Sequence, residues 1–207
     1  KHMPKDVVKE YIEFINRESN GQAWNYLEVI EDQDTKAEDY NWIAAVTDFR
    51  LYNSMKTIFT FSGDLRSLPA NAVNDSRSVT FGANHDTIRA LNDKAINPYA
   101  DITDSYLATS YVLARESGTP LIFNEHNLLA PYIKYGVRFR EVMVQRGREG
   151  KNVKETILRF PNSNTVAMMQ RGPEGLFVIN KSTDRFNVPA LDLTLTDLEG
   201  CYNELRN

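Results

Sequence analysis

The sequence has little cysteine: Cys201 is the only one among 207 residues. An intramolecular disulfide is therefore excluded, and the cellular compartment stays open. No apolar run approaches the roughly 18 residues that a membrane-spanning helix needs, so we expect no membrane partner. The N-terminus also lacks the basic, apolar and small-residue regions of a secretion signal.

Charge of one sign is not concentrated anywhere in the sequence. Lys and Arg number 24 against 28 Asp and Glu, and the net charge of −4 is spread along the chain without a basic run. Because basic runs neutralise phosphates, we expect no nucleic-acid partner. Hydrophobic residues at 42% and charged residues at 25% are globular proportions, which exclude a disordered or low-complexity chain.

Both ends of the sequence look cut. It opens with Lys1-His2-Met3, and it stops after Glu204-Leu205-Arg206-Asn207 without an evident terminal cap. An expression scar is one explanation of His2-Met3.

Strand-like and helix-like segments alternate in the first part of the chain. Short apolar runs rich in β-branched and aromatic residues predict strands at 23–30, 46–50, 78–83 and 119–124. Apolar residues at helical spacing predict helices at 6–19, 35–45, 51–61, 104–117 and 130–145. Serial strand–helix units imply parallel strands with right-handed crossovers, either in an open α/β sheet or in part of a (β/α) barrel.

The pattern changes after Gly147. Short runs separated by turn residues predict antiparallel strands at 156–160, 165–171, 176–182 and 191–195. The boundary is predicted at 147–152, so residues 1–150 form the α/β domain. Residues 151–207 are few for an independent β-sandwich, and we expect an incomplete one that packs on the first domain.

Polar residues just past an apolar strand are the first candidates for chemistry, because parallel α/β folds gather reactive groups where strands end. Glu28 lies in the otherwise apolar run AWNYLEVI. A carboxyl buried in such a strand keeps its proton more firmly, which is how a general acid is made. A surface glutamate on a half-exposed strand is the alternative interpretation.

The triplet Asn84-His85-Asp86 follows the next candidate strand, SVTFGA. A helix N-cap by Asn84 or Asp86 explains it as well as a catalytic role does. A metal site that combines the triplet with Glu125-His126 is a third interpretation, although the spacing matches no known ligand pattern. Serine-nucleophile motifs, phosphate-binding glycine loops and CxxC pairs are absent from the sequence, so we expect no organic cofactor.

The order of these segments resembles the α-amylase family of glycoside hydrolases over nearly the whole length. SVTFGANHDTIR (78–89) looks like the motif that ends the seventh barrel strand, and NYLEVIED (25–32) is similar to the fifth-strand motif with the acid/base glutamate. Lys1-His2-Met3 looks like the tail of the fourth-strand motif, whose nucleophilic aspartate stands ahead of a Lys-His pair. Residues 118–123 suit the eighth strand, and 165–182 resemble the first hairpin of the C-terminal β domain.

The resemblance implies strands 5–8 of a (β/α)8 TIM barrel, a half-barrel, followed by a partial antiparallel β-sandwich domain. It makes Glu28 the general acid and then the base of a retaining hydrolysis. Asp86 is then the carboxylate that binds sugar hydroxyls and stabilises the oxocarbenium-like transition state. Asn84 and His85 are implied to bind substrate beside it.

The resemblance also implies partners and ions. Lys1 and His2 contact sugar on the leaving-group side, and the His2 carbonyl faces a calcium site in members that keep one. Chloride-dependent members carry an arginine just after the eighth-strand glycine, where this chain has Thr119, which argues against chloride activation. The nucleophile and the N-terminal half of the barrel precede Lys1, so we expect a fragment that is inactive alone.

The implied substrate is an α-1,4-glucan such as starch or a maltooligosaccharide. Two alternatives stay open: a transglycosylase or isomerase of the same family, and a non-catalytic glucan-binding or interaction domain. Retention of both Glu28 and Asp86 argues against the second alternative. Trp24 and Tyr26 are candidates for stacking on sugar rings, although core packing is the favoured prediction for them.

Overall fold

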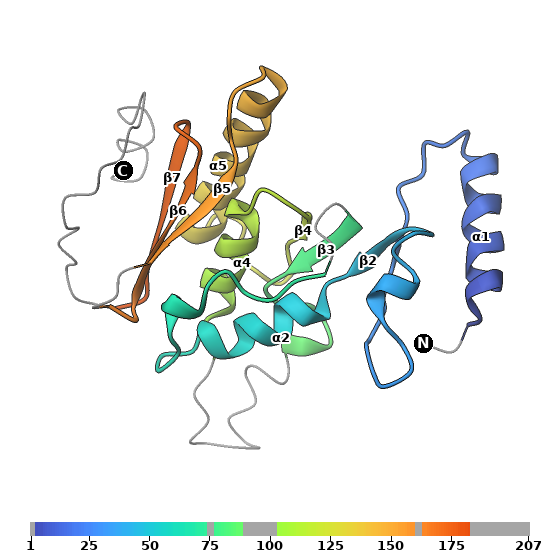
Figure 1. Ribbon diagram of the computed structural model, residues 1–207, viewed down its shortest axis with the longest axis horizontal. Coiled ribbons are helices and arrows are strands. Elements are labelled where there is room, and N and C mark those ends of the chain that lie inside the picture. The colour runs from blue at the N-terminus through green and yellow to red at the C-terminus, as the bar shows by residue number, and fades with distance from the viewer. Residues whose placement is uncertain (1–2, 74–76, 89–102, 160–162, 183–207) are drawn as a thin grey trace.

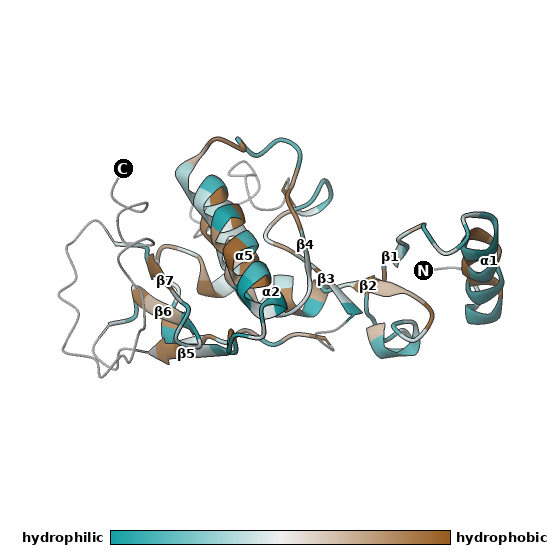
Figure 2. Cartoon of the chain, turned by 90° about the horizontal axis from the view of Figure 1, so that it is seen from above, coloured by the Kyte–Doolittle hydropathy of each residue, from teal (hydrophilic) through white to brown (hydrophobic). Residues whose placement is uncertain are grey.

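The computed structural model describes residues 3–73, 77–88, 103–159 and 163–182. These residues form a parallel and an antiparallel sheet with helices around them (Figure 1). Helix α1 lies at one end of the molecule and the antiparallel sheet at the other, as Figures 1 and 2 both show. In the described part of the chain, the helices are too short or too polar to cross a membrane.

The parallel sheet has four strands in the order β1-β2-β3-β4. The strands are β1 (Tyr26–Leu27), β2 (Ala45–Thr47), β3 (Ser78–Phe81) and β4 (Thr119–Leu121). All three pairings are parallel, and β3 is buried at each of its four residues, because a central parallel strand is covered on both faces. The predicted parallel strands are thus confirmed.

Four α-helices accompany this sheet in the described residues. They are α1 (Lys5–Glu18), α2 (Phe49–Ile58), α4 (Ser105–Ala114) and α5 (Pro131–Arg148). Two of them begin at an aspartate that caps free backbone N–H groups: Asp48 accepts from the Leu51 amide, and Asp104 accepts from two amides of α4. These caps fix where the helices begin relative to the preceding strands or loops.

Several predicted elements are shorter than expected, and two of them lose most of their predicted length. The helix expected at 35–45 is reduced to one 3-10 turn, η1 (Ala37–Asp39). The Asp32 carboxylate accepts from the amides of Asp34 and Thr35, and such side-chain bonds compete with helix formation. The strand expected at 23–30 keeps only the two residues of β1, which pairs with the three-residue β2 alone.

The antiparallel sheet contains β5 (Glu155–Arg159), β6 (Val166–Arg171) and β7 (Gly175–Asn180) in that order. A turn with Gly172 at φ 54° joins β6 to β7, a conformation that favours glycine. The strand predicted at 191–195 lies outside the described residues. The coarse prediction of a parallel sheet followed by an antiparallel one is confirmed, whereas the two-domain division stays a prediction.

The largest apolar core joins the antiparallel sheet to the helices. Leu51 and Met55 of α2, Tyr111 of α4, and Met169 and Ile179 of β6 and β7 are all buried in it. Helix α5, which carries both apolar and polar residues (Figure 2), packs against α4. The Arg171 Nη1 group also donates to the Ala114 carbonyl at 2.9 Å, so a hydrogen bond ties β6 to the end of α4.

Candidate active site

The carboxyl ends of β1 and β3 bring three of the predicted site residues together. Glu28 follows β1 directly, and His85 and Asp86 lie in the turn after β3. A carboxylate oxygen of Glu28, a ring nitrogen of His85 and a carboxylate oxygen of Asp86 lie within 4.8 Å of one another. Within the described ranges this is the only group of three His, Cys, Asp or Glu side chains at such distances.

Glu28 is exposed, so the interpretation as a surface glutamate is confirmed and the interpretation as a buried carboxyl is wrong. The physical reason is its place in the sheet. It follows the two-residue strand β1. This strand lies at one edge of the sheet and, among the described residues, pairs only with β2. Val29, the next residue, is buried, and its amide donates to the Thr47 hydroxyl at 2.9 Å. The backbone beside Glu28 is therefore fixed while its side chain faces outward.

The turn after β3 is held by Asn84. Its Oδ1 atom accepts from the Asp86 amide at 3.1 Å and from the Thr87 amide at 2.9 Å. In return the Thr87 hydroxyl accepts from the Asn84 amide at 2.9 Å, which gives a reciprocal capping arrangement. The capping interpretation is thus confirmed for Asn84.

The Asp86 carboxylate does not take part in this cap. Its side chain is 60% exposed, and its Oδ1 atom lies 3.4 Å from His85 Nε2. His85 is still more exposed, at 72% of its side chain. Both groups are free to meet a ligand, and together with Glu28 they offer two carboxylates and one imidazole to the same point.

The combined metal site with Glu125-His126 is not assembled. His126 is buried, its Nε2 atom lies 3.2 Å from the Ser105 hydroxyl, and its ring stacks on Tyr106 at a centroid distance of 4.5 Å. Desolvation lowers the pKa of His126. Because these aromatic and helical neighbours hold the ring, that interpretation of the sequence is wrong.

Two predicted site residues at the N-terminus have no structural test. Lys1 and His2 lie outside the described residues. Their sugar contacts and the calcium site at the His2 carbonyl stay predictions.

Asp48 is a buried carboxylate that the sequence analysis did not single out. It follows β2 and is fully buried, with Oδ1 accepting from the Leu51 amide at 2.8 Å and Oδ2 from the Val73 amide at 3.1 Å. Burial raises the pKa of Asp48, although both backbone bonds oppose the shift. It is a polar residue just past an apolar strand, so the rule that found Glu28 could also have found Asp48.

Trp24 and Tyr26 are exposed by 55% and 44%, so the core packing favoured for them is wrong. Their ring centroids are 5.4 Å apart.

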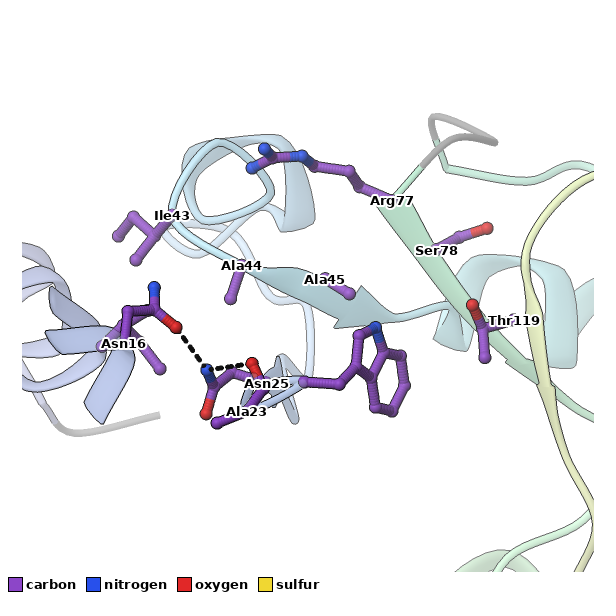
Figure 3. A pocket seen from close by; sticks show the side chains of 11 residues that line it. Asn16, Ala23, Asn25, Ile43, Ala44, Ala45, Arg77, Ser78 and Thr119 are labelled. Carbon is purple, nitrogen blue, oxygen red and sulfur yellow. Dashed lines mark hydrogen bonds between the residues drawn. The ribbon is translucent and has the colours of Figure 1, made fainter. Parts of the chain in front are cut away.

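A cavity of about 330 Å³ lies where the strands begin, and Trp24 lines it. Figure 3 shows Arg77, Ser78 and Thr119 around this cavity. This cavity lies at the amino ends of the strands, whereas Glu28 and Asp86 follow their carboxyl ends.

Comparisons with known proteins agree with the sheet arrangement. No family model matches the chain. An alpha-amylase from Aeromonas hydrophila is 26% identical over 151 residues, which are 65% of this chain and 30% of that protein. The crystal structure of alpha-amylase I from Eisenia fetida superposes with a TM-score of 0.59 at 16% identity over 76% of this chain and 40% of that one. A variant of the same enzyme in complex with maltohexaose matches equally well.

The chain is an α/β protein with a parallel sheet followed by an antiparallel sheet, which is the fold seen in alpha-amylase structures. The sequence match then supports the family, and part of this chain is related to the alpha-amylases, as the motifs predicted. The chain spans 30% to 40% of the length of the relatives that it matches. The relationship points to the glycoside hydrolases as a class.

Proposed function

We propose that this chain is part of a retaining glycoside hydrolase that acts on α-1,4-glucans. The observation that carries the proposal is the meeting of Glu28, His85 and Asp86 within 4.8 Å at the carboxyl ends of parallel strands. The partial relationship to an alpha-amylase supports it, as does the maltohexaose bound to the structural neighbour. The four parallel strands correspond in this proposal to strands 5–8 of a (β/α)8 barrel, and the antiparallel sheet to part of a β-sandwich.

Glycosidic cleavage with retention needs an acid that protonates the leaving oxygen and later deprotonates water. Glu28 takes this role, since it is the carboxylate that follows the first strand of the sheet. Asp86 binds sugar hydroxyls, and its negative charge stabilises the positive charge that develops at the anomeric carbon. His85, 3.4 Å from Asp86, donates a hydrogen bond to the same sugar. In this proposal the nucleophilic carboxylate belongs to the fourth barrel strand, as the resemblance implies.

The exposure of Glu28 is consistent with this role only in a larger assembly. A general acid needs surroundings from which water is largely excluded. Strand β1 has an unpaired outer edge in the described residues, and closing a barrel would cover that edge. We therefore assign the covering of Glu28 to the N-terminal half of the barrel and to the bound glucan.

The proposal makes this chain part of a longer protein, which is called the intact protein from here on. Incubation of the intact protein with maltohexaose tests the proposal. Shorter maltooligosaccharides, separated by chromatography, are the expected products. Chains longer than maltohexaose as the main products would identify a transglycosylase instead. An isomerised product of unchanged length, or binding without any product, would also contradict the proposed hydrolysis.

A further inference from the structure

We propose that Arg50 of α2 is a positioning residue for the Glu28 carboxylate and acts through Glu31. The inference rests on the proposed function, because it assumes that Glu28 is the general acid. It assigns a purpose to an ion-pair network that begins three residues after Glu28 and that the proposed hydrolysis does not otherwise use.

The first step concerns what holds Glu28. Its side chain is exposed, so the position of the carboxylate depends on the backbone around it. The Val29 amide donates to the Thr47 hydroxyl at 2.9 Å, and both residues are buried. Strand β1 ends before Glu28, so the pairing with β2 does not extend to the residues that follow. The segment after Val29 leaves the sheet and needs an anchor of its own.

The second step identifies that anchor as Arg50, which binds two carboxylates at once. Its Nη2 and Nε groups donate to the two oxygens of Glu31 at 2.6 and 3.3 Å. Its Nη1 and Nη2 groups donate to the two oxygens of Glu38 at 2.7 and 3.1 Å. Both contacts are bidentate, a geometry that a planar guanidinium permits and a lysine ammonium does not. Arg50 therefore fixes the orientation of Glu31 as well as its distance.

The third step passes this constraint to the backbone. The Glu31 Oε1 atom also accepts from the Ala37 amide at 3.1 Å, so a side chain closes the loop between these two residues. Ala37 is fully buried and belongs to the same apolar cluster as Val29. The segment that follows Glu28 is thus held at Val29 by β2 and at Glu31 by α2.

Both anchors belong to one junction between a strand and a helix. Thr47 is the last residue of β2, and Arg50 is the second residue of α2. Asp48 lies between them, is fully buried, and donates its amide to the Val79 carbonyl of β3 at 2.9 Å. Because β3 leads into the turn with Asp86, this junction relates the proposed acid to the second carboxylate of the site.

Stability alone does not explain such a network. Exposed ion pairs contribute little to the free energy of folding, because water screens them. The Glu38 side chain is 51% exposed and that of Arg50 28%, so loss of the network should leave the fold intact. Its effect is expected instead in the position of Glu28.

The test compares Arg50→Lys and Glu31→Gln in the intact protein on maltohexaose. Lysine keeps the charge without the bidentate contacts, and glutamine keeps the shape without the charge. A displacement of about 1 Å in a catalytic group can cost about a hundredfold in rate. We expect each variant to lower kcat about tenfold to a hundredfold, with KM changed less than about threefold. The double variant should lose little more than either single one, because Arg50 acts through Glu31.

The matched control is Arg66→Lys. The Nε and Nη2 groups of Arg66 also bind one carboxylate bidentately, at 2.9 and 2.7 Å from the oxygens of Asp64, but this pair lies at the short helix η2 (Leu65–Ser67). The control should leave kcat unchanged. If Arg50→Lys keeps kcat within twofold of wild type, the inference is overturned. It is equally overturned if Arg66→Lys lowers kcat as much, because the effect is then one of general stability.

A second readout separates failure of this inference from failure of the proposed function. Amide hydrogen exchange reports the Val29 and Ala37 N–H bonds without any substrate. Faster exchange of both amides in Arg50→Lys, but not in Arg66→Lys, supports the positioning even if the wild type cleaves no glucan. Unchanged exchange in Arg50→Lys contradicts it, whatever the activity of the wild type.

Discussion

Asn84 and Asp86 follow the same strand, yet their side chains do opposite things. The Asn84 side chain turns back and accepts two backbone N–H groups, whereas the Asp86 carboxylate faces outward. Sequence alone left the cap open between them, because both residue types cap helices well. The geometry separates the residue that maintains the turn from the residue whose carboxylate is exposed, and only the second is available for the proposed contact with sugar.

This separation predicts how Asp86→Asn behaves. The amide keeps the size of the side chain and the cap belongs to Asn84, so the melting temperature of the intact protein should change little. Loss of the negative charge should lower kcat on maltohexaose by about a hundredfold or more. Asn84→Ala is the comparison, because it removes the cap and should cost about 1 kcal/mol of stability. A variant Asp86→Asn that melts, with normal turnover in its folded fraction, would favour a structural role.

Glu28 carries the sharpest prediction at this scale. Glu28→Gln cannot transfer a proton, so turnover should fall by several orders of magnitude while the glucan still binds. Steady-state kinetics and equilibrium binding of maltohexaose measure the two effects separately. Glu13→Gln, an exposed glutamate of α1, is the control and should be neutral. Activity of Glu28→Gln within tenfold of wild type would rule out the assignment.

At the scale of elements, the central strands were predictable and the edge was not. β3 lies between β2 and β4 and is buried throughout, so its local apolar run is enough to find it. β1 lies at the edge, and the length and burial of an edge strand depend on neighbours that its own residues do not encode. That is why the apolar run around Glu28 could be found in the sequence, whereas a buried and a surface position both stayed open for its side chain.

The helix expected at 35–45 failed for a different reason. Its apolar spacing is helical, but the preceding acidic residues bind the backbone instead. Glu31 accepts from the Ala37 amide at 3.1 Å and also pairs with Arg50 of α2 at 2.6 Å. Such contacts between distant segments decide the local structure, and hydrophobic periodicity carries no sign of them.

Asp48 joins β2, α2 and residue 73, and its raised pKa gives a prediction for these elements. A carboxyl whose pKa is raised on folding loses stability as pH rises from the ordinary value of about 3.9 towards the folded-state pKa. An asparagine at position 48 does not titrate. Its side chain also has one acceptor oxygen, whereas the two oxygens of Asp48 accept from two backbone amides. Asp48→Asn should therefore be destabilised most at low pH, by about 1 kcal/mol, and the deficit should shrink as pH rises.

Thermal unfolding of the intact protein from pH 3 to 7 measures this trend. Asp64→Asn is the control, and its stability relative to the wild type should change with pH in the opposite direction. Arg66 lowers the pKa of Asp64, so the wild type gains stability relative to Asp64→Asn as pH rises. A deficit of Asp48→Asn that stays constant or grows with pH would contradict the assignment of a burial-raised pKa.

At the scale of the whole molecule, the described residues leave apolar surface and sheet edges uncovered. Val7, Tyr11 and Phe14 of α1 are exposed, and α1 lies at one end of the molecule (Figure 1). The outer edges of β1 and β4 pair with no other strand in the described part. Open edges and apolar faces of this kind favour association between chains.

We therefore expect residues 1–207 expressed alone to dimerise or aggregate and to cleave no maltooligosaccharide. The second expectation follows from the proposed function, in which the nucleophilic carboxylate belongs to the fourth barrel strand, because the glycosyl intermediate cannot form without that carboxylate. Light scattering coupled to gel filtration, with a maltohexaose assay on each fraction, measures both. A soluble monomer of 1–207 that hydrolyses α-1,4-glucans would show that the active site has been misplaced.

The most direct measurement is the stereochemistry of cleavage by the intact protein. Proton NMR of maltohexaose hydrolysis distinguishes the α from the β anomer of each newly formed reducing end before mutarotation mixes them. Two successive inversions, one at the enzyme carboxylate and one by water that Glu28 activates, predict that the α anomer forms first. Initial formation of the β anomer, or no cleavage at all, would contradict the proposed retaining hydrolysis.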